Sequence, residues 1–271
     1  MCIRMNKVSV NPYSVRNKMR KNKYILGAII TKNFKAQYRN SILGVVWTVL
    51  NPLLNMIVLA LVFSEMFGKE GVGNYPVYLF CGTLIFSIMR QSTSQSLTSI
   101  VNNSGLIKKV KISYSVFPIS NTLLSIINFG LSFVALIAIM LVEGQKFHWT
   151  IVLTLTIIPA VLMFSLGIGL VLASLYVFFR DIKHIYSVVL TLWTYLTPIF
   201  YTAQSLKNPA IIKFIELNPM TQYVTMFRDI IQWGNIPSWG TYLYGYAFAL
   251  GMWGIGYLIY RLVRKKFILY I

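Results

Sequence analysis

The chain has 271 residues, of which 56% are hydrophobic and 11% charged, and its formal net charge is +19. Soluble domains carry about 25% charged residues, so this composition excludes an ordinary water-soluble fold and favours the lipid bilayer as the surrounding solvent. The positive charge does not indicate a nucleic-acid-binding protein, because the basic residues lie between long apolar runs and do not gather on one polar domain.

The N-terminal segment 1–43 is basic, holding ten of the 25 Lys and Arg residues, and it lacks the pattern of a cleaved signal peptide. Within it, residues 22–41 predict an amphipathic helix, because Lys32, Lys35 and Arg39 recur at the spacing of one helix face. The opposite face carries Leu26, Ile30, Phe34 and Tyr38, together with Ile25 and Ile29. This pattern is typical of a helix lying in the membrane interface. A positive flank that is merely helical is the alternative.

Six stretches are long and apolar enough to cross the hydrocarbon core as helices, which takes about 20 residues each. They are residues 45–67, 77–101, 119–142, 151–179, 185–203 and 241–262. No stretch remains for a soluble domain. The sequence therefore predicts an all-α integral membrane protein, with one six-span membrane domain over residues 44–271.

The positions of Lys and Arg predict the orientation of these spans. If the N-terminus is cytoplasmic, 19 of the 25 basic residues fall in cytoplasmic segments and five in external ones. We therefore expect both termini in the cytoplasm.

Arg90 lies well inside the second predicted span and is followed by a run of Ser, Thr and Gln up to Thr98. An arginine at that depth is costly on an isolated helix, so it should face a wet cavity or a partner. The polar run indicates a helix face that lines an aqueous path. Alternatively, the span is displaced inwards and Arg90 reaches the headgroups.

The segment 204–240 is much longer than an ordinary connection and is apolar on both sides of Asn218-Pro219. Each half is too short to cross the bilayer, and a proline ends a helix. The sequence therefore predicts a re-entrant pair of short helices between the last two spans, with an amphipathic loop on the surface as the alternative.

No nucleotide-binding loop, catalytic cluster or paired carboxylates occur, so we expect no enzyme activity and no cofactor in this chain. Cys2 and Cys81 make no disulfide or metal pattern, and His148 and His184 lie far apart, so no metal site is predicted. The acidic residues lie at span ends or in loops, which argues against a proton-coupled transporter. Three deep aromatic residues, Tyr176, Trp193 and Tyr195, offer ring faces to a sugar chain.

Several segments together resemble one family. They are residues 38–44 (YRNSILG), Trp47, 51–53 (NPL), 62–64 (VFS), 103–110 (NSGLIKKV), 117–118 (FP), 179–184 (FRDIKH), 192–201 (LWTYLTPIFY), 217–219 (LNP) and 227–228 (FR). In order and spacing they are similar to the type-2 ABC exporter permeases that move lipid-linked polysaccharides, the O-antigen and teichoic-acid exporters. The resemblance covers residues from about 22 to 265.

This resemblance implies a homodimer in a bacterial inner or plasma membrane, seated on two copies of a separate ATPase that holds ATP and Mg. It implies that loop 102–118 contains a coupling helix that docks into the ATPase, with Gly105 permitting a sharp turn and apolar side chains filling a groove. The residues expected to make this contact are Gly105, Leu106, Ile107, Lys108, Lys109 and Lys111.

The resemblance further implies an outer gate within 204–240 and a conduit between the long helices. The gate residues would be Asn218, Pro219, Phe227 and Arg228, and the conduit would be lined by Arg90, Tyr176, Trp193 and Tyr195. Arg90 departs from the family, whose members carry aromatic or aliphatic residues near this position.

The predicted function is ATP-driven export of a lipid-linked glycan, whose pyrophosphate Lys32, Lys35 and Arg39 would attract at the cytoplasmic face. Three alternatives stay open. They are an ATP-driven permease for a drug or small lipid, an ATP-independent channel or flippase, and a membrane anchor without transport activity.

Overall fold

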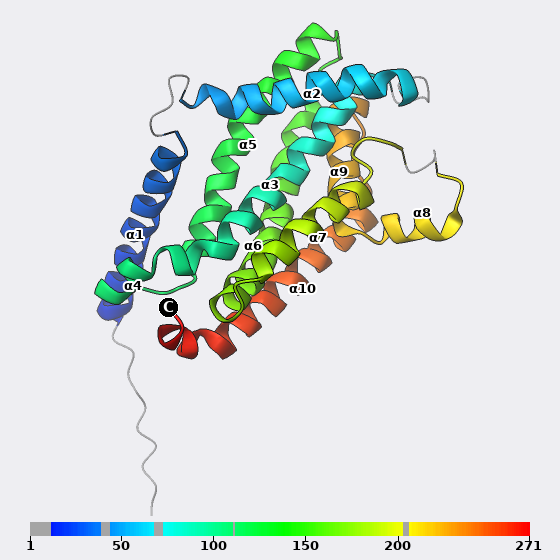
Figure 1. Ribbon diagram of the computed structural model, residues 1–271. Helices are drawn as coiled ribbons and strands as arrows, with labels where there is room; N and C mark the ends of the chain where they lie inside the picture. Colours follow the sequence, from blue (N-terminus) through cyan, green and yellow to red (C-terminus); the bar gives the residue numbers. More distant parts are fainter. Residues whose placement is uncertain (1–11, 39–43, 68–72, 111, 203–205) are drawn as a thin grey trace, which may run out of the picture.

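The computed structural model describes residues 12–38, 44–67, 73–110, 112–202 and 206–271, which form helices joined by short connections (Figure 1). The α-helices are α1 (Pro12–Tyr38), α2 (Val46–Phe67), α3 (Tyr75–Asn102), α4 (Ser104–Lys109), α5 (Val116–Val142), α6 (Thr154–Phe178), α7 (Ile182–Leu196), α8 (Pro209–Glu216), α9 (Pro219–Arg228) and α10 (Trp239–Val263). Shorter helical segments are the 3-10 helices η1 (Trp149–Leu153) and η4 (Arg264–Leu269) and the π-helix η3 (Asp229–Trp233). The described residues contain no strand, which confirms the all-α prediction.

Among the residues that the structure describes, three helical stretches are long and apolar enough to cross a membrane: Val116–Val142, Trp149–Phe178 and Trp239–Leu269. Helix α3 has 28 residues and is as long as these, but it is polar from Arg90 onward. This polar half lowers its hydropathy below that of a uniformly apolar span. The helices are those of an integral membrane protein.

Helices lie over all six stretches predicted as spans, but the prediction for 185–203 is wrong at its C-terminal end, where α7 stops at Leu196. Pro198 explains the difference, because a residue that precedes proline disfavours the helical conformation. Thr197 accordingly adopts an extended backbone with φ −100° and ψ 128°. Helix α7 therefore has 15 residues and, at ~1.5 Å per residue, does not cover the ~30 Å of the hydrocarbon core, so the fifth predicted span is helical over only part of its length.

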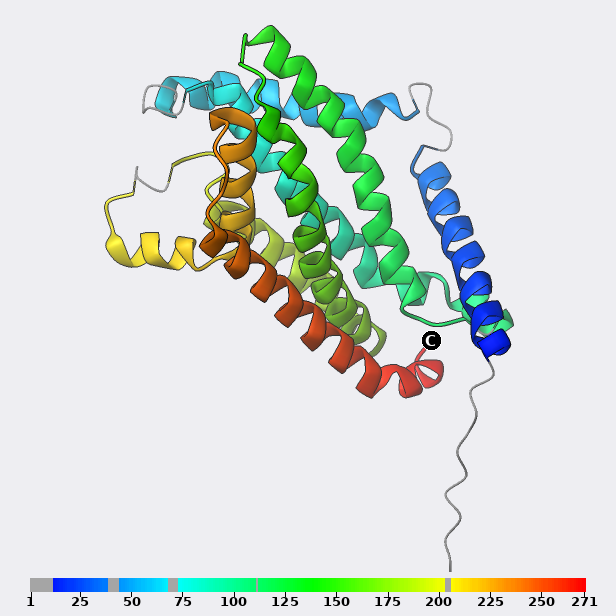
Figure 2. The same cartoon turned by 180° about the vertical axis from the view of Figure 1, so that it is seen from behind.

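The long helices α5, α3, α6 and α10 pack in that order, each beside the next, and α1 stands alongside α5 (Figures 1 and 2). Helix α2 differs from them, because it crosses α3 and α5 at one end of the bundle (Figure 1). It contacts the bundle through the buried side chains of Met56 and Ala60, whereas Leu54, Val58 and Leu61 are exposed. The sequence predicts residues 45–67 as one of six spans and gives no indication of this transverse orientation.

Two glycines bring α6 and α10 into backbone contact. A Cβ atom at Gly256 would collide with the carbonyl of Gly167, and one at Gly167 would collide with the backbone of Met252. Small residues at helix crossings are typical of membrane proteins, in which close van der Waals packing replaces the hydrophobic driving force.

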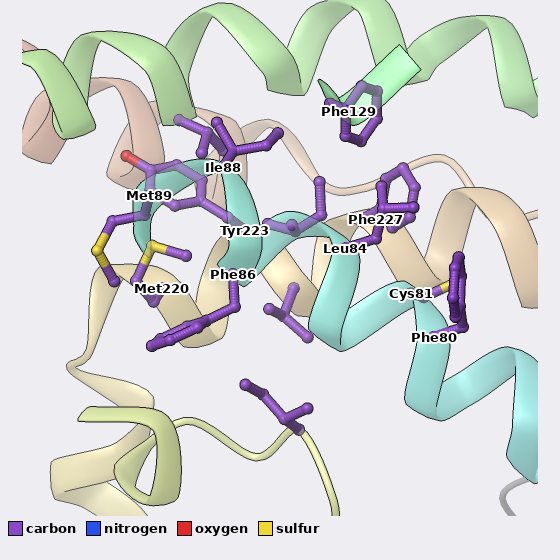
Figure 3. Packing of buried hydrophobic residues seen from close by; sticks show 14 of the residues in the cluster. Phe80, Cys81, Leu84, Phe86, Ile88, Met89, Phe129, Met220, Tyr223 and Phe227 are labelled. Atoms are coloured by element: carbon purple, nitrogen blue, oxygen red, sulfur yellow. The ribbon is translucent and has the colours of Figure 1, made fainter. Parts of the chain in front are cut away.

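Helix α3 lies at the centre of the main hydrophobic cluster (Figure 3). Its residues Leu84 and Ile88 share this cluster with Phe129 of α5 and with Tyr223 and Phe227 of α9. The Phe227 ring meets the Phe129 ring edge-on, with a centroid distance of 6.3 Å. Although α9 is short, it is part of the core of the bundle.

A second cluster joins segments that are distant in the sequence at one end of the bundle. It contains Ile29 of α1, Ile107 of α4, Phe117 of α5, Tyr260 of α10 and Phe267 of η4. The C-terminal segment therefore folds back beside the α3–α5 connection (Figure 1). This arrangement brings the predicted cytoplasmic loop 102–118 and the C-terminus to the same end.

Candidate functional site

A cavity of about 810 Å³ opens between α2, α3, α5 and the segment that follows α7. This volume falls within the range of ligand sites, about 300–1,000 Å³. Four aromatic side chains contribute to its wall, those of Trp47, Phe80, Phe86 and Phe200, and amide and hydroxyl groups supply the polar part. A wall that combines rings with polar side chains suits a ligand such as a carbohydrate, which has both apolar faces and hydroxyl groups.

Arg90 lines this cavity from the middle of α3. Its side chain is exposed, and it makes no hydrogen bond or ion pair with any residue that the structure describes. The described acidic residues Glu143, Asp181, Glu216 and Asp229 do not line the cavity. The guanidinium therefore enters the cavity as a positive charge without a described counter-charge.

Two glutamines beside Arg90 are fixed by one asparagine. The side-chain Nδ2 of Asn128 donates to Oε1 of Gln91 at 2.9 Å and to Oε1 of Gln37 at 3.5 Å. Because both glutamine oxygens are engaged, the NH2 groups of Gln37 and Gln91 remain as donors at the cavity wall.

The polar run after Arg90 does not line an aqueous path along its whole length, and that expectation is wrong for Ser92, Thr93 and Ser96. These three side chains are fully buried between helices. The Ser92 and Thr122 hydroxyls are 2.7 Å apart, and the Tyr186 hydroxyl donates to Thr93 at 2.6 Å. Most of the run therefore joins α3 to α5 and α7 through hydrogen bonds.

Of the four residues predicted to line the conduit, Arg90 alone lies on the described wall of the large cavity. The Tyr176 ring lies under Arg180, whose Cζ is 5.1 Å from the ring centroid. Trp193 packs edge-on against Phe164, and the largely exposed Tyr195 ring lies 6.3 Å from the ring of Phe200, a residue of the cavity wall. The structure thus does not bring these aromatic residues together with Arg90.

The segment between α7 and α10 forms two short helices, α8 and α9, which meet at Asn218-Pro219 as predicted. Asn218 joins three elements. Its Oδ1 accepts from the Met220 backbone N–H at 3.1 Å and from Trp193 Nε1 at 2.9 Å, and its Nδ2 donates to the Thr197 hydroxyl at 3.0 Å. This side chain caps α9 and attaches it to the end of α7.

Arg228, at the end of α9, is buried with an exposed fraction of 4%. Its guanidinium donates to the carbonyls of Tyr78, Pro198 and Ile199 at 3.1, 2.7 and 2.9 Å. It also lies over the Tyr78 ring, with Cζ 3.4 Å from the centroid. Three carbonyl dipoles and one ring face therefore surround this cation, which holds α9 against α3 and the turn after α7.

The residues predicted to contact an ATPase lie on or beside α4, a helix of six residues. Leu106, Lys108 and Lys109 are exposed, whereas Ile107 is buried in the second cluster and is not available to fill a groove in a partner. Gly105 lies inside the helix and does not form the sharp turn that we expected. Lys111 falls outside the described residues.

The residues predicted to attract pyrophosphate lie on α1, except Arg39, which falls outside the described residues. Lys32 and Lys35 are exposed, and Lys32 Nζ donates to Asn103 Oδ1 at 3.3 Å. Lys32 also lines a polar groove of about 380 Å³ between α1 and α3. The apolar side of α1 packs on protein, because Ile29 has an exposed fraction of 4%.

Sequence reasoning missed the amide groups of the large cavity. Asn51 and Asn55 lie one turn apart on α2, and Gln37 and Gln91 meet through Asn128. The pair on α2 could have been found, because two asparagines at i and i+4 are unusual in an apolar span. The Asn128 network joins three helices and follows only from their packing. Among the residues that the structure describes, no group of His, Cys, Asp and Glu side chains could hold a metal ion.

Comparison with known proteins gives one consistent result. Residues 24–231 match the family described as ABC-2 type transporter. The O-antigen export system permease protein RfbA of Myxococcus xanthus is 31% identical over 215 residues, which cover 79% of this chain and 82% of that protein. A protein of the same name from Klebsiella pneumoniae is 27% identical over 249 residues, with 90% and 93% covered. The polysialic acid transport protein KpsM of Escherichia coli is 22% identical over 241 residues, with 88% and 93% covered.

Proposed function

Because this chain belongs to the ABC-2 type transporter family, we propose that it is the membrane-spanning permease subunit of an ATP-driven exporter of a lipid-linked polysaccharide. The similarity to O-antigen export permeases over most of both chains carries this proposal. The large cavity supports it, since its aromatic and amide side chains suit sugar rings and their hydroxyl groups. The glycan would move from the cytoplasm to the outer face of a bacterial inner or plasma membrane.

The proposed topology has six spans with both termini in the cytoplasm. The basic residues Lys108 and Lys109 lie at the same end of the molecule as Arg264 and Lys265, next to the second hydrophobic cluster. Positive charge concentrated at one end favours the cytoplasmic side for that end. In this arrangement α1 would act as an interface helix whose apolar side packs on protein through Ile29 and not on lipid, and α8 with α9 would re-enter the membrane from outside as the outer gate.

The proposed assembly contains two copies of this chain and two copies of a separate ATPase, which would bind ATP and Mg. The exposed apolar side chains of α2 leave a surface that lipid or a second copy of the chain would cover in the membrane. The exposed lysines of α4 support docking onto an acidic groove of the ATPase. This chain would contribute no ATPase site of its own.

The proposal is tested by co-purifying the chain with the ATPase that its genomic neighbourhood encodes and measuring ATP turnover in lipid nanodiscs. We expect stable assembly and turnover that rises when lipid-linked glycan is added. Turnover that responds to hydrophobic drugs but not to glycan would replace polysaccharide with a small hydrophobic substrate. Failure to assemble with any ATPase would contradict the proposal and favour a channel or flippase.

The docking role of α4 is tested in the same complex. The double variant Lys108→Glu and Lys109→Glu reverses two exposed charges, and we expect it to uncouple ATP hydrolysis from glycan export. Lys146→Glu is a matched control, because Lys146 is an exposed lysine in the α5–η1 connection. Normal export by the double variant would contradict the docking role.

A further inference from the structure

The large cavity differs from an ordinary sugar-binding groove in its charge. The Arg90 side chain is exposed on its wall and has no hydrogen bond or ion pair with the described residues. A free guanidinium in the middle of a membrane helix is unfavourable unless water or a ligand meets it. Because the described acidic residues lie elsewhere, a carboxylate within the described part of this chain does not neutralise it.

The neighbouring polar groups have the same character, since they present hydrogen-bond donors. Asn128 holds the side-chain oxygens of Gln37 and Gln91, which leaves the NH2 groups of both glutamines as donors at the wall. The hydroxyl of Ser87 donates to the Leu84 carbonyl at 2.7 Å, so its hydrogen is already used. One cation and two oriented amides thus lie together as donors to a ligand, and the amides of Asn51 and Asn55 and the indole N–H of Trp47 line the same wall.

Such a set of donors favours an oxyanion over a neutral hydroxyl group. A hydroxyl both donates and accepts, whereas a carboxylate or phosphate only accepts, and its charge strengthens each hydrogen bond. Guanidinium is suited to these groups, because its planar fork matches two oxygens of a carboxylate or phosphate. The nearby rings of Trp47 and Phe80 can pack against the apolar face of the sugar that carries the group.

We propose that Arg90, with Gln37 and Gln91, forms an oxyanion-binding site for an acidic group of the transported lipid-linked glycan. The acidic group is a carboxylate or phosphate, borne either by the sugar units or by the pyrophosphate that joins the glycan to its lipid. This inference rests on the proposed export function and adds to it, because it makes the cavity selective for charged ligands.

Equilibrium binding to the complete complex in nanodiscs tests the site, with calorimetry as the measurement. Three probes separate the sources of charge: a tetrasaccharide containing glucuronate, a neutral glucose tetrasaccharide, and undecaprenyl pyrophosphate without sugar. We expect Arg90→Gln to weaken the binding of at least one acidic probe about tenfold or more and to leave the neutral probe unchanged. Arg90→Lys should weaken it less, because the charge is kept while the fork is lost.

The control variant is Lys146→Gln, which removes an exposed positive charge that does not line the cavity and should bind all three probes as the unmodified complex does. If Arg90→Gln weakens the binding of the glucuronate probe alone, the acidic group lies in the sugar units. If it weakens the binding of undecaprenyl pyrophosphate, the acidic group lies in the lipid linkage. Either result supports the site. Unchanged binding of both acidic probes by Arg90→Gln overturns it, and so does equal weakening of acidic and neutral probes.

The same preparations separate this inference from the export function. Glycan-dependent ATP turnover by the unmodified complex reports on export, whatever Arg90 does. If that turnover occurs and Arg90→Gln binds every probe normally, the oxyanion site is wrong while the export function stands. If the unmodified complex shows no glycan-dependent turnover, the proposed export function itself is contradicted, whatever the binding measurements show.

Discussion

Two arginines of this membrane protein lie in opposite environments, although both belong to largely apolar helical regions. Arg228 is buried, donates to three carbonyls and lies over the Tyr78 ring. The Arg90 side chain is exposed in a large cavity and makes no hydrogen bond or ion pair with the described residues. The comparison shows that the role of a cation in the membrane depends on its partner atoms and not on its depth. A cation whose donors are satisfied by protein carbonyls is structural, whereas one without protein partners can bind a ligand.

The region around Arg228 is built so that carbonyl groups bind the guanidinium, and no described carboxylate forms an ion pair with it. Gly82 leaves room for it, since a Cβ atom there would lie 2.6 Å from Nη2 of Arg228. The carbonyls of Pro198 and Ile199 belong to the turn in which α7 has ended, so they point toward a donor outside the helix. The early end of α7 thus creates the acceptors that bind Arg228.

The largest effect is expected for Arg228→Met, which keeps much of the side-chain volume and removes all the donors. We expect the free energy of unfolding to fall by about 3 kcal/mol or more, because each buried carbonyl left without its donor costs about 1–3 kcal/mol. The measurement is denaturant unfolding of the purified protein in detergent micelles, followed by tryptophan fluorescence.

Arg228→Lys is the informative companion variant. An ammonium keeps the charge but cannot reproduce the planar fork that reaches three carbonyls, so an intermediate loss of stability is expected. If Arg228→Met is as stable as the unmodified protein, the structural role assigned to this residue is wrong.

The next largest effect is expected for Gly82→Ala, which tests the space around the same guanidinium. The added methyl group would lie 2.6 Å from Arg228 and 3.3 Å from the Ile199 side chain, so the packing must shift at a cost of about 1–3 kcal/mol. The matched control is Gly130→Ala on α5, where no heavy atom lies within 4 Å of the added carbon. Gly82→Ala should unfold at lower denaturant than Gly130→Ala, and the reverse order would contradict the close contact.

A smaller loss is expected for Asn218→Ala, which removes the cap of α9 and its attachment to α7. Helix capping contributes about 1 kcal/mol, and the bonds to Trp193 and Thr197 add to it, so about 1–2 kcal/mol is expected. Combining Asn218→Ala with Trp193→Phe should cost less than the sum of the two single changes, because both remove the same hydrogen bond. Full additivity would show that this bond contributes little.

The comparison also shows what a sequence can reveal in this protein. The helical class and the break at Asn218-Pro219 could be predicted, because long apolar stretches and proline act locally. The end of α7 at Leu196 could also have been predicted from the local sequence, because Pro198 disfavours a helical conformation at Thr197. It was missed because the largely apolar residues 185–203 indicate one continuous span. Contacts between distant segments could not be predicted in this way. The carbonyls that bind Arg228 lie about 30 and 150 residues away, and Gln37 approaches Gln91 only through Asn128 on a third helix.

The smallest effect on stability is expected for Arg90→Gln, and it completes the comparison with Arg228. Since Arg90 has no described partner to lose, we expect the free energy of unfolding to change by less than about 0.5 kcal/mol, as for a surface substitution away from special features. Export of the glycan should nevertheless fall if the guanidinium binds its acidic group. Unfolding in micelles and glycan export from cells measure the two effects separately. A large loss of stability would place Arg90 with Arg228 as a structural cation, whereas unchanged stability with reduced export would separate the two arginines by function.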